Sequence, residues 1–157
     1  MRNFFIVLCF VFICPDLNAS PAIQQPANSL LLISIDGFAQ DYLQRYKAPT
    51  LHRLAQNGVT AVAMQPSFPT KTFPNHYSIA TGLYPAHHGI VENNIYDTDF
   101  DAVFRMSKPE EVKNARWWLG EPVWVTAEKQ GVKTGTYFFP GSEAAIKGCL
   151  LYTSPSP

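Results

Sequence analysis

The clearest structural signals of this chain lie between Pro66 and Ile90, in P-S-F-P-T-K-T-F-P-N-H-Y-S-I-A-T-G-L-Y-P-A-H-H-G-I. Thr72 stands directly before Phe73-Pro74, and proline is favoured in the first turn of a helix. Threonine is a favoured N-cap residue and glycine a favoured terminator, so we expect a helix capped by Thr72 and ended by Gly82. The N-terminus of such a helix attracts anions, because its N–H groups are unpaired and its dipole is positive there.

Upstream of this stretch, the apolar run Leu30–Ile35 reads L-L-L-I-S-I and is followed by Asp36-Gly37. Nearly continuous apolar runs are typical of strands that are buried on both faces of a parallel sheet. Ligands of open α/β sheets bind at the carboxyl ends of strands, where Asp36 would lie. A carboxylate there can bind a cation, but an Asp-Gly pair that only forms a turn fits the residues equally well.

The other segments alternate between helical and strand patterns. We expect helices over Pro49–Asn57, capped by Gly58, and over Gly120–Gln130, closed by Gly131. Strands are expected over Val59–Met64 and Val132–Phe139. Strands that alternate with helices indicate an α/β fold with a largely parallel central sheet covered by helices.

Two polar side chains are candidates for chemistry. The Thr72 hydroxyl is a poor nucleophile with a very high pKa, so it needs a base, a bound metal ion or a local positive field. Asn93, which is followed by Asn94, carries an amide that can donate hydrogen bonds to a phosphoryl oxygen. Taken alone, Thr72 fits a plain N-cap and Asn93 a solvated turn residue.

The histidines His76, His87 and His88 invite a zinc assignment. His87 and His88 are adjacent in a turn rich in proline and glycine, so their side chains point in different directions. We therefore expect none of the three to bind metal, and we expect Phe73 and Tyr77 to be packing residues.

Composition limits the class of protein. The chain has 157 residues, of which 46% are hydrophobic and 15% charged, so it can form one packed domain. Its formal net charge is +0, which argues against a protein that binds a nucleic-acid backbone.

The N-terminus has the pattern of an export signal. Arg2 is followed by the apolar run Phe4–Cys14, which is short for a membrane span. We expect a signal peptide over residues 1–19, a linker over 20–29, and a periplasmic or secreted protein without a stable membrane span. An uncleaved membrane anchor or a lipoprotein modified at Cys14 are the alternatives.

Several motifs, taken in order, resemble one family. They are I-S-I-D-G-F at Asp36, P-T-K-T-F-P-N-H-Y at Thr72, A-T-G-L-Y-P-A-H-H-G-I-V-E-N-N, W-W-L-G-E-P-V-W-V-T and F-P-G-S-E. Over Leu30–Gly148 the chain resembles the ectonucleotide pyrophosphatase/phosphodiesterase family, within the alkaline phosphatase superfamily. The resemblance implies an alkaline-phosphatase-like fold and two zinc ions, with Asp36 and Thr72 as metal ligands. It also implies that Thr72 is the nucleophile of a covalent intermediate.

The resemblance implies substrate contacts as well. Asn93, rather than Asn94, would contact the phosphoryl oxygen, and Phe73 would stack on the base of the substrate. The implied reaction is hydrolysis of phosphodiester or pyrophosphate bonds in small nucleotides. No arginine lies near Thr72, and a monoesterase would more naturally present a bidentate arginine. The alternatives are a phosphodiesterase for lysophospholipid or phosphocholine-type substrates and a truncated, non-catalytic binding module.

The chain is much shorter than the catalytic domain of that family. Asp36 and Thr72 cannot complete a zinc site, because zinc takes three or four protein ligands. We therefore expect residues 30–148 to be the N-terminal part of the catalytic domain, inactive alone. The ending Cys149–Pro157 reads C-L-L-Y-T-S-P-S-P, the in-frame translation of a sequence resembling a transposon-end sequencing adapter. We expect this ending to be an artefact and the natural protein to be longer.

Overall fold

The computed structural model describes residues 29–149. The chain divides into two compact units, Met1–Leu32 and Ile33–Pro157, and the second unit contains every helix and strand given below. The expected signal peptide, nearly all of the expected linker, and the expected adapter segment apart from Cys149 lie outside the described residues.

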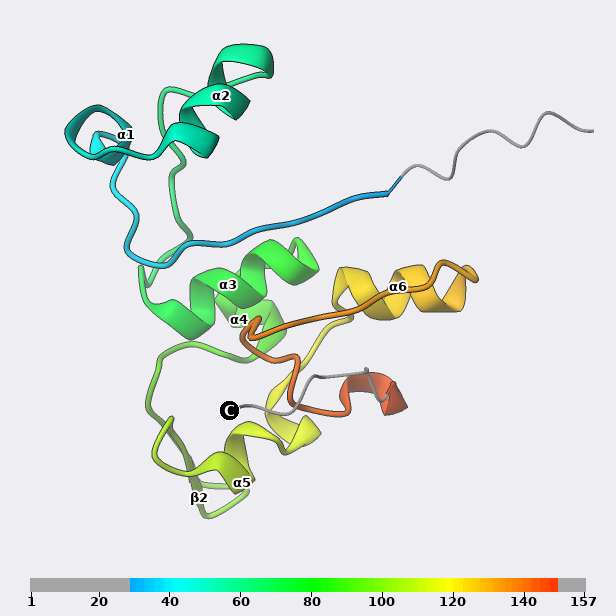
Figure 1. Cartoon of the computed structure of the whole chain (residues 1–157). Coiled ribbons are helices and arrows are strands. Elements are labelled where there is room, and N and C mark those ends of the chain that lie inside the picture. Colours follow the sequence, from blue (N-terminus) through cyan, green and yellow to red (C-terminus); the bar gives the residue numbers. More distant parts are fainter. Residues whose placement is uncertain (1–28, 150–157) are drawn as a thin grey trace, which may run out of the picture. The chain divides into compact units, whose positions relative to one another are not determined.

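The first helices of the second unit are α1 (Tyr42–Arg45) and α2 (Pro49–Asn57), both labelled in Figure 1. The bounds of α2 confirm the predicted helix, with Pro49 in the first turn and Gly58 directly after the last residue. Pro49 suits this position because the first N–H groups of a helix have no partner within the helix. Neither helix contains a buried residue, and Leu54 of α2 is 58% exposed.

Helix α3 (Thr72–Thr81), labelled in Figure 1, contains five buried residues. It ends as predicted, at Gly82, whose φ of 70° is left-handed and whose N–H donates to the Ser78 carbonyl at 2.8 Å. The prediction of Thr72 as N-cap is wrong by one residue. Lys71 is the N-cap and Thr72 the first helical residue, and no side chain caps the helix.

One face of α3 packs into an aromatic core. Tyr77 and Trp118 lie edge-to-face with ring centroids 4.9 Å apart, and the rings of Phe104 and Trp118 are 5.5 Å apart. Such pairs add to the stabilisation that burial of their large apolar surfaces gives. The buried apolar residues are Phe73, Tyr77, Ala80, Ile90, Phe104, Val112, Trp117, Trp118, Trp124, Val125, Ala144 and Ile146.

Short elements build the rest of this core. They are the helices α4 (Pro85–His88), α5 (Pro109–Val112) and α6 (Val123–Lys129), the 3₁₀ turns η1 (Ala115–Trp117) and η2 (Ile146–Gly148), and the strands β1 (Ile95–Asp97) and β2 (Ala102–Phe104). The two strands pair antiparallel, with Ile95 opposite Phe104 and Asp97 opposite Ala102. Helix α6 lies within the predicted range Gly120–Gln130 but begins only after Pro122, its N-cap.

The predicted strands over 30–35, 59–64 and 132–139 are not formed within residues 29–149, where β1 and β2 make the sheet. A strand requires a neighbour that accepts and donates its main-chain hydrogen bonds. Most of their apolar side chains are instead exposed, as Ile33 at 65% and Val59 at 102% illustrate. Phe139 of the third segment is an exception, because it is half-buried and packs against the core beside Trp124.

Among residues 29–149, no helix has both the length and the apolar character that crossing a membrane requires.

Candidate active site

Asp36 and Thr72 meet although 36 positions separate them in the sequence. Asp36 lies in the turn that follows the apolar segment, next to Gly37 with φ 66°, and Thr72 is the first residue of α3. The Thr72 Oγ1 hydroxyl donates to Asp36 Oδ2 at 2.9 Å. Since the hydroxyl does not cap the helix, it is directed at the carboxylate instead. Of the two interpretations of Thr72, the plain N-cap does not agree with this geometry.

Asn93, from a third segment of the chain, contacts the residue next to Thr72. The Phe73 N–H, in the first turn of α3, donates to Asn93 Oδ1 at 3.0 Å. An N–H group can bond only to the oxygen of the amide, so this contact fixes which way the amide faces. The Asn93 NH₂ group therefore faces away from the Phe73 N–H and keeps its donors for another partner. The Asn93 N–H in turn donates to Glu92 Oε1 at 2.8 Å.

The Phe73 ring occupies a core position. Only 6% of the residue is exposed, and its ring lies edge-to-face on Phe104 at 5.3 Å and on Trp118 at 6.0 Å. A base could stack on this ring only after the side chains that cover it had moved. Base stacking by Phe73 stays a prediction, and the contribution of this residue described here is its main-chain N–H.

The histidines occupy structural positions within the described part of the chain. His76 Nδ1 lies 2.7 Å from the Thr72 carbonyl, which can only accept, so Nδ1 carries the proton. His88 is fully buried, and both of its ring nitrogens have hydrogen-bond partners, Ser78 and Ile90. His87 is exposed in the last turn of α4.

The pair Asp36 and Thr72 fits part of a metal site. A carboxylate oxygen and a hydroxyl oxygen, 2.9 Å apart, are both ligands that zinc accepts. However, residues 29–149 contain no group of three His, Cys, Asp or Glu side chains that could hold a metal ion. The two oxygens can therefore supply part of a ligand set but not all of it.

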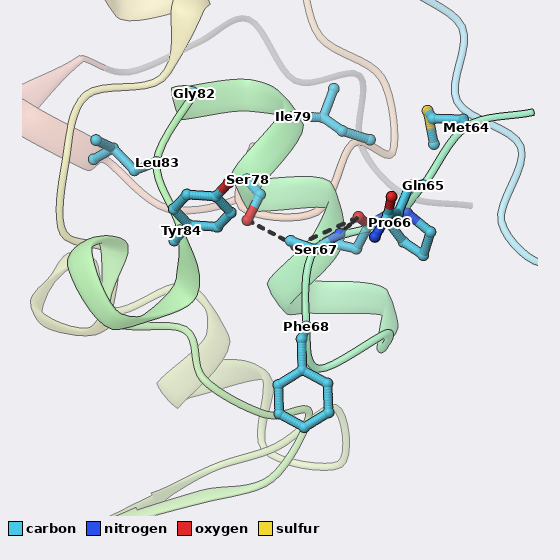
Figure 2. A pocket seen from close by; sticks show the side chains of 11 residues that line it. Met64, Gln65, Pro66, Ser67, Phe68, Ser78, Ile79, Gly82, Leu83 and Tyr84 are labelled. Atoms are coloured by element: carbon cyan, nitrogen blue, oxygen red, sulfur yellow. Dashed lines mark hydrogen bonds between the residues drawn. The ribbon is translucent and has the colours of Figure 1, made fainter. Parts of the chain in front are cut away.

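Sequence reasoning missed a set of contacts that holds the chain just before Thr72 (Figure 2). The Ser67 N–H donates to Asn75 Oδ1 at 3.0 Å, and the Ser67 hydroxyl donates to Ser78 Oγ at 3.0 Å. We call these two contacts the Ser67 clip. They fasten the segment before the helix onto α3 itself. Serine and asparagine residues carry no pattern that would have revealed this pairing.

The Ser67 clip lies at an open pocket of about 670 Å³ between the segment Met64–Phe68, α3 and Leu83-Tyr84 (Figure 2). Asn75, Ser78 and Ile79 of α3 line it, together with Gly82 directly after the helix. Ser78 and Ile79 lie three and four residues after Asn75 and hence on the same helix face. Asp36, Thr72 and Asn93 do not line this pocket. The candidate chemistry is therefore at the N-terminus of α3 and not in this cavity.

Comparison with known proteins agrees with this geometry. Residues 30–156 match the model of the family described as type I phosphodiesterase / nucleotide pyrophosphatase. The chain is 49% identical over 121 residues to ectonucleotide pyrophosphatase/phosphodiesterase family member 3 of Bos taurus. It is 46% identical over 136 residues to venom phosphodiesterase 2 of Crotalus adamanteus.

A solved structure shares the fold. It is murine ectonucleotide pyrophosphatase/phosphodiesterase 5, an inactive threonine-to-alanine variant in complex with AMP, with a TM-score of 0.71 and 31% identity. The similarity covers 76% of this chain and 32% of that one. The chain therefore has the α/β, alkaline-phosphatase-like fold of these proteins, in incomplete form.

The matches cover most of this chain but a small part of each relative. They include 76% of this chain and 14% of the bovine protein, and 83% of this chain and 17% of the venom enzyme. The family model, by contrast, matches nearly everything from the apolar segment before Asp36 onward. The chain belongs to the type I phosphodiesterase / nucleotide pyrophosphatase family.

Proposed function

We propose that the protein containing this chain hydrolyses phosphodiester or pyrophosphate bonds in small nucleotides, with Thr72 as nucleophile. The observation that carries the proposal is the meeting of three separate segments at the N-terminus of α3. Thr72 Oγ1 lies 2.9 Å from Asp36 Oδ2, and Asn93 Oδ1 accepts from the Phe73 N–H at 3.0 Å. A hydroxyl, a carboxylate and an oriented amide can serve as nucleophile, orienting group and hydrogen-bond donor when a phosphoryl group is transferred to threonine.

Each of the three side chains has a separate role in the proposed reaction. Thr72 loses its hydroxyl proton to solvent and attacks phosphorus, so that the Oγ1–P bond forms while the bond to the leaving oxygen breaks and the leaving group departs into solvent. Water then cleaves the threonine ester and restores the hydroxyl. Asn93 donates its NH₂ group to a phosphoryl oxygen, where charge accumulates during both displacements. Asp36 orients the Thr72 hydroxyl by accepting its hydrogen bond.

Zinc is the metal we propose for this site, with Asp36 and Thr72 as two of its ligands and the remaining ligands outside the described residues. A divalent cation that binds a hydroxyl lowers its pKa and offsets the charge of the phosphoryl group. The physical need is clear, because an unassisted threonine hydroxyl is almost fully protonated at neutral pH.

A nucleotide diester is the proposed substrate class, cleaved to a nucleoside monophosphate. A diester carries one negative charge at the reacting phosphate, which suits the neutral amide of Asn93 better than a monoester would. AMP, which is present in the structure of the inactive murine relative, is a nucleoside monophosphate. We further propose an exported location outside the cell, since the similar curated proteins are animal ectonucleotide enzymes. These relatives give no support to the bacterial periplasm.

The test of the proposal is Thr72→Ala in the full-length natural protein, assayed with a nitrophenyl nucleotide diester. We expect turnover to fall by at least about 1,000-fold, because removal of a nucleophile leaves only the contribution of the remaining site. The melting temperature should change little, since Thr72 does not cap α3.

Thr72→Ser is the matched control, because it keeps the hydroxyl and should keep measurable turnover. Treatment with a zinc chelator should abolish wild-type turnover, and added zinc should restore it. Substantial activity of Thr72→Ala would remove Thr72 as the nucleophile, and activity that survives metal removal would remove zinc from the proposal.

A further inference from the structure

His88 is a buried polar side chain that the proposed chemistry does not use. It is the last residue of α4, is 0% exposed, and packs edge-to-face against Tyr77 with ring centroids 5.0 Å apart. A buried polar ring is costly unless both of its nitrogens have hydrogen-bond partners. The identity of those partners therefore shows what the ring connects.

The two ring nitrogens of His88 have partners on different segments. Nδ1 accepts from the Ile90 N–H at 3.2 Å, so this nitrogen carries no proton. Nε2 must then carry the proton, and it donates to Ser78 Oγ at 3.0 Å. Burial lowers the pKa of His88, which keeps the ring in this neutral form.

Each partner leads to a residue of the candidate active site. Ser78 lies on α3, the helix that begins with Thr72, and its Oγ also accepts from Ser67 in the Ser67 clip. Ile90 is fully buried and opens the short segment that ends at Asn93. His88 is thus bonded to the helix that presents the nucleophile and to the segment that presents the amide.

Among the described residues, a direct hydrogen bond between the two segments lies at the far end of this arrangement, in addition to the packing of Ile90 in the same core as Tyr77. There the Phe73 N–H donates to Asn93 Oδ1 at 3.0 Å. With His88 between Ser78 and Ile90, the helix and the Asn93 segment are joined at two points along their length. A second point of attachment restricts the relative motion of two segments more than a single one does.

We propose that His88 is a positioning residue, which holds Thr72 and Asn93 in register by linking Ser78 of α3 to Ile90. This proposal rests on the proposed function. Loss of the link should lower kcat without raising KM, because the nucleophile and the amide must be aligned in the transition state. A small misplacement of reacting groups costs about 10- to 100-fold in rate.

The experiment uses substitutions that remove one nitrogen of His88 at a time in the full-length protein. His88→Asn keeps an acceptor where Nδ1 stands, for the Ile90 N–H, but cannot reach Ser78. His88→Gln keeps a donor that can reach Ser78 and loses the acceptor for Ile90. Ser78→Ala removes the partner on α3, together with the contact to the Ser67 hydroxyl, and leaves the imidazole in place. We expect each to lower kcat by about 10- to 100-fold at constant KM.

Thr81→Val is the control variant for a loss of stability alone. Thr81 also lies on α3, where its hydroxyl donates to the Tyr77 carbonyl at 2.7 Å and accepts from the Leu83 N–H at 3.2 Å. This substitution removes comparable hydrogen bonds without touching the link. We expect it to lower the melting temperature and to leave kcat unchanged.

The double variant Ser78→Ala/His88→Asn tests whether the two residues affect kcat through the same hydrogen bond or independently. If His88 acts through Ser78, the double variant should lose no more kcat than the worse single variant. If the double variant instead loses kcat by the product of the two single losses, the proposed link is wrong. It is also wrong if the single variants have the same kcat as Thr81→Val. An inert wild-type protein would instead overturn the proposed function, and the positioning role with it.

Discussion

Asn93 carries two different hydrogen-bonding atoms, and the structure gives each a separate place. Its oxygen accepts from the Phe73 N–H at 3.0 Å, and its NH₂ group is thereby directed elsewhere. Stability should therefore depend on the oxygen and catalysis on the nitrogen. A substitution that changes only one of these atoms can separate the two.

Asn93→Asp is that substitution. The carboxylate still accepts from the Phe73 N–H, and a negative charge at the N-terminus of α3 should stabilise the fold by about 0.3–1 kcal/mol. Turnover of a nucleotide diester should nevertheless fall by about 100- to 1,000-fold, because a donor to the phosphoryl oxygen is replaced by a repelling charge. Calorimetry and steady-state kinetics on the same preparation measure both quantities.

Asn93→Ala completes the comparison, because it removes both atoms and should lower stability as well as turnover. A destabilised Asn93→Asp protein would show that the contact with the Phe73 N–H has been misassigned. Unchanged turnover would show that the NH₂ group does not meet the substrate.

Single residues also show the limits of what the sequence could predict. Asp36, Thr72 and Asn93 were named from their types and motifs, and the structure brings them together. His88 was recognised only as an unpromising zinc ligand. Its two hydrogen bonds depend on where α3 and α4 lie in space, and neither spacing nor residue type encodes that directly.

Glycines that end or join helices differ in what a side chain would meet. Gly82 at the end of α3 has φ 70° and open space around the position of a Cβ atom. Gly141 has φ 93°, and a Cβ atom there would lie 2.8 Å from Cζ3 of the buried Trp118. The first position carries backbone strain alone, and the second carries strain together with a clash against a rigid ring.

We expect Gly82→Ala to lower the free energy of unfolding by about 1–2 kcal/mol, the cost of a left-handed alanine. Gly141→Ala should cost about 1–3 kcal/mol more, as overpacking in a core does. Urea denaturation of the two variants measures the difference. Equal losses would show that Trp118 can move aside without penalty.

The carboxylate of Glu111 on α5 accepts two hydrogen bonds from residues of η1. Glu111 accepts from the Trp117 indole N–H at 2.7 Å and from Arg116 Nη2 at 2.6 Å. These hydrogen bonds, the indole's first and the guanidinium's second, lower the pKa of Glu111 below its usual value. Between the usual pKa and the lowered one, the unfolded chain takes up a proton that the folded chain does not.

The contribution of Glu111 to stability is therefore complete above its usual pKa and is lost as the pH falls through the lowered one. We expect the melting temperature of Glu111→Gln to fall less steeply with acid than that of the wild-type protein. Thermal scans from about pH 6 to about pH 3 cover this window, which contains the usual carboxylate range. The control is Glu110→Gln, at the exposed neighbouring residue. If the melting temperatures of all three proteins fall equally with decreasing pH, Glu111 does not contribute as described.

The helices were predictable where local chemistry decides their ends, as at Pro49 and Gly82. The strands were not, because a strand is completed by a partner that is remote in sequence. Val59–Met64 has a strand pattern, yet Val59 and Val62 are 102% and 94% exposed. The hairpin β1–β2 was missed because each strand has only three residues, too few for a clear alternation.

These uncovered side chains predict how the isolated chain behaves. Large apolar residues exposed within the second unit include Ile33, Val59, Val62, Met64 and Phe68. Surfaces of this kind associate in water. We expect the isolated chain to self-associate at micromolar concentration and to bind a hydrophobic dye, and the full-length protein to do neither. Light scattering after gel filtration measures this, and a stable monomer without dye binding would contradict it.

The Ser67 clip has a consequence for how this family can diversify. Because Ser67 is bonded to Asn75 and Ser78 on one face of α3, the few residues between the clip and Thr72 form a short loop that is held at both ends, by the clip and by the start of the helix. Substitutions within such a loop alter the surface that a substrate meets while its ends stay in place. Evolution can therefore exchange the loop to select new substrates while the same threonine carries out unchanged chemistry.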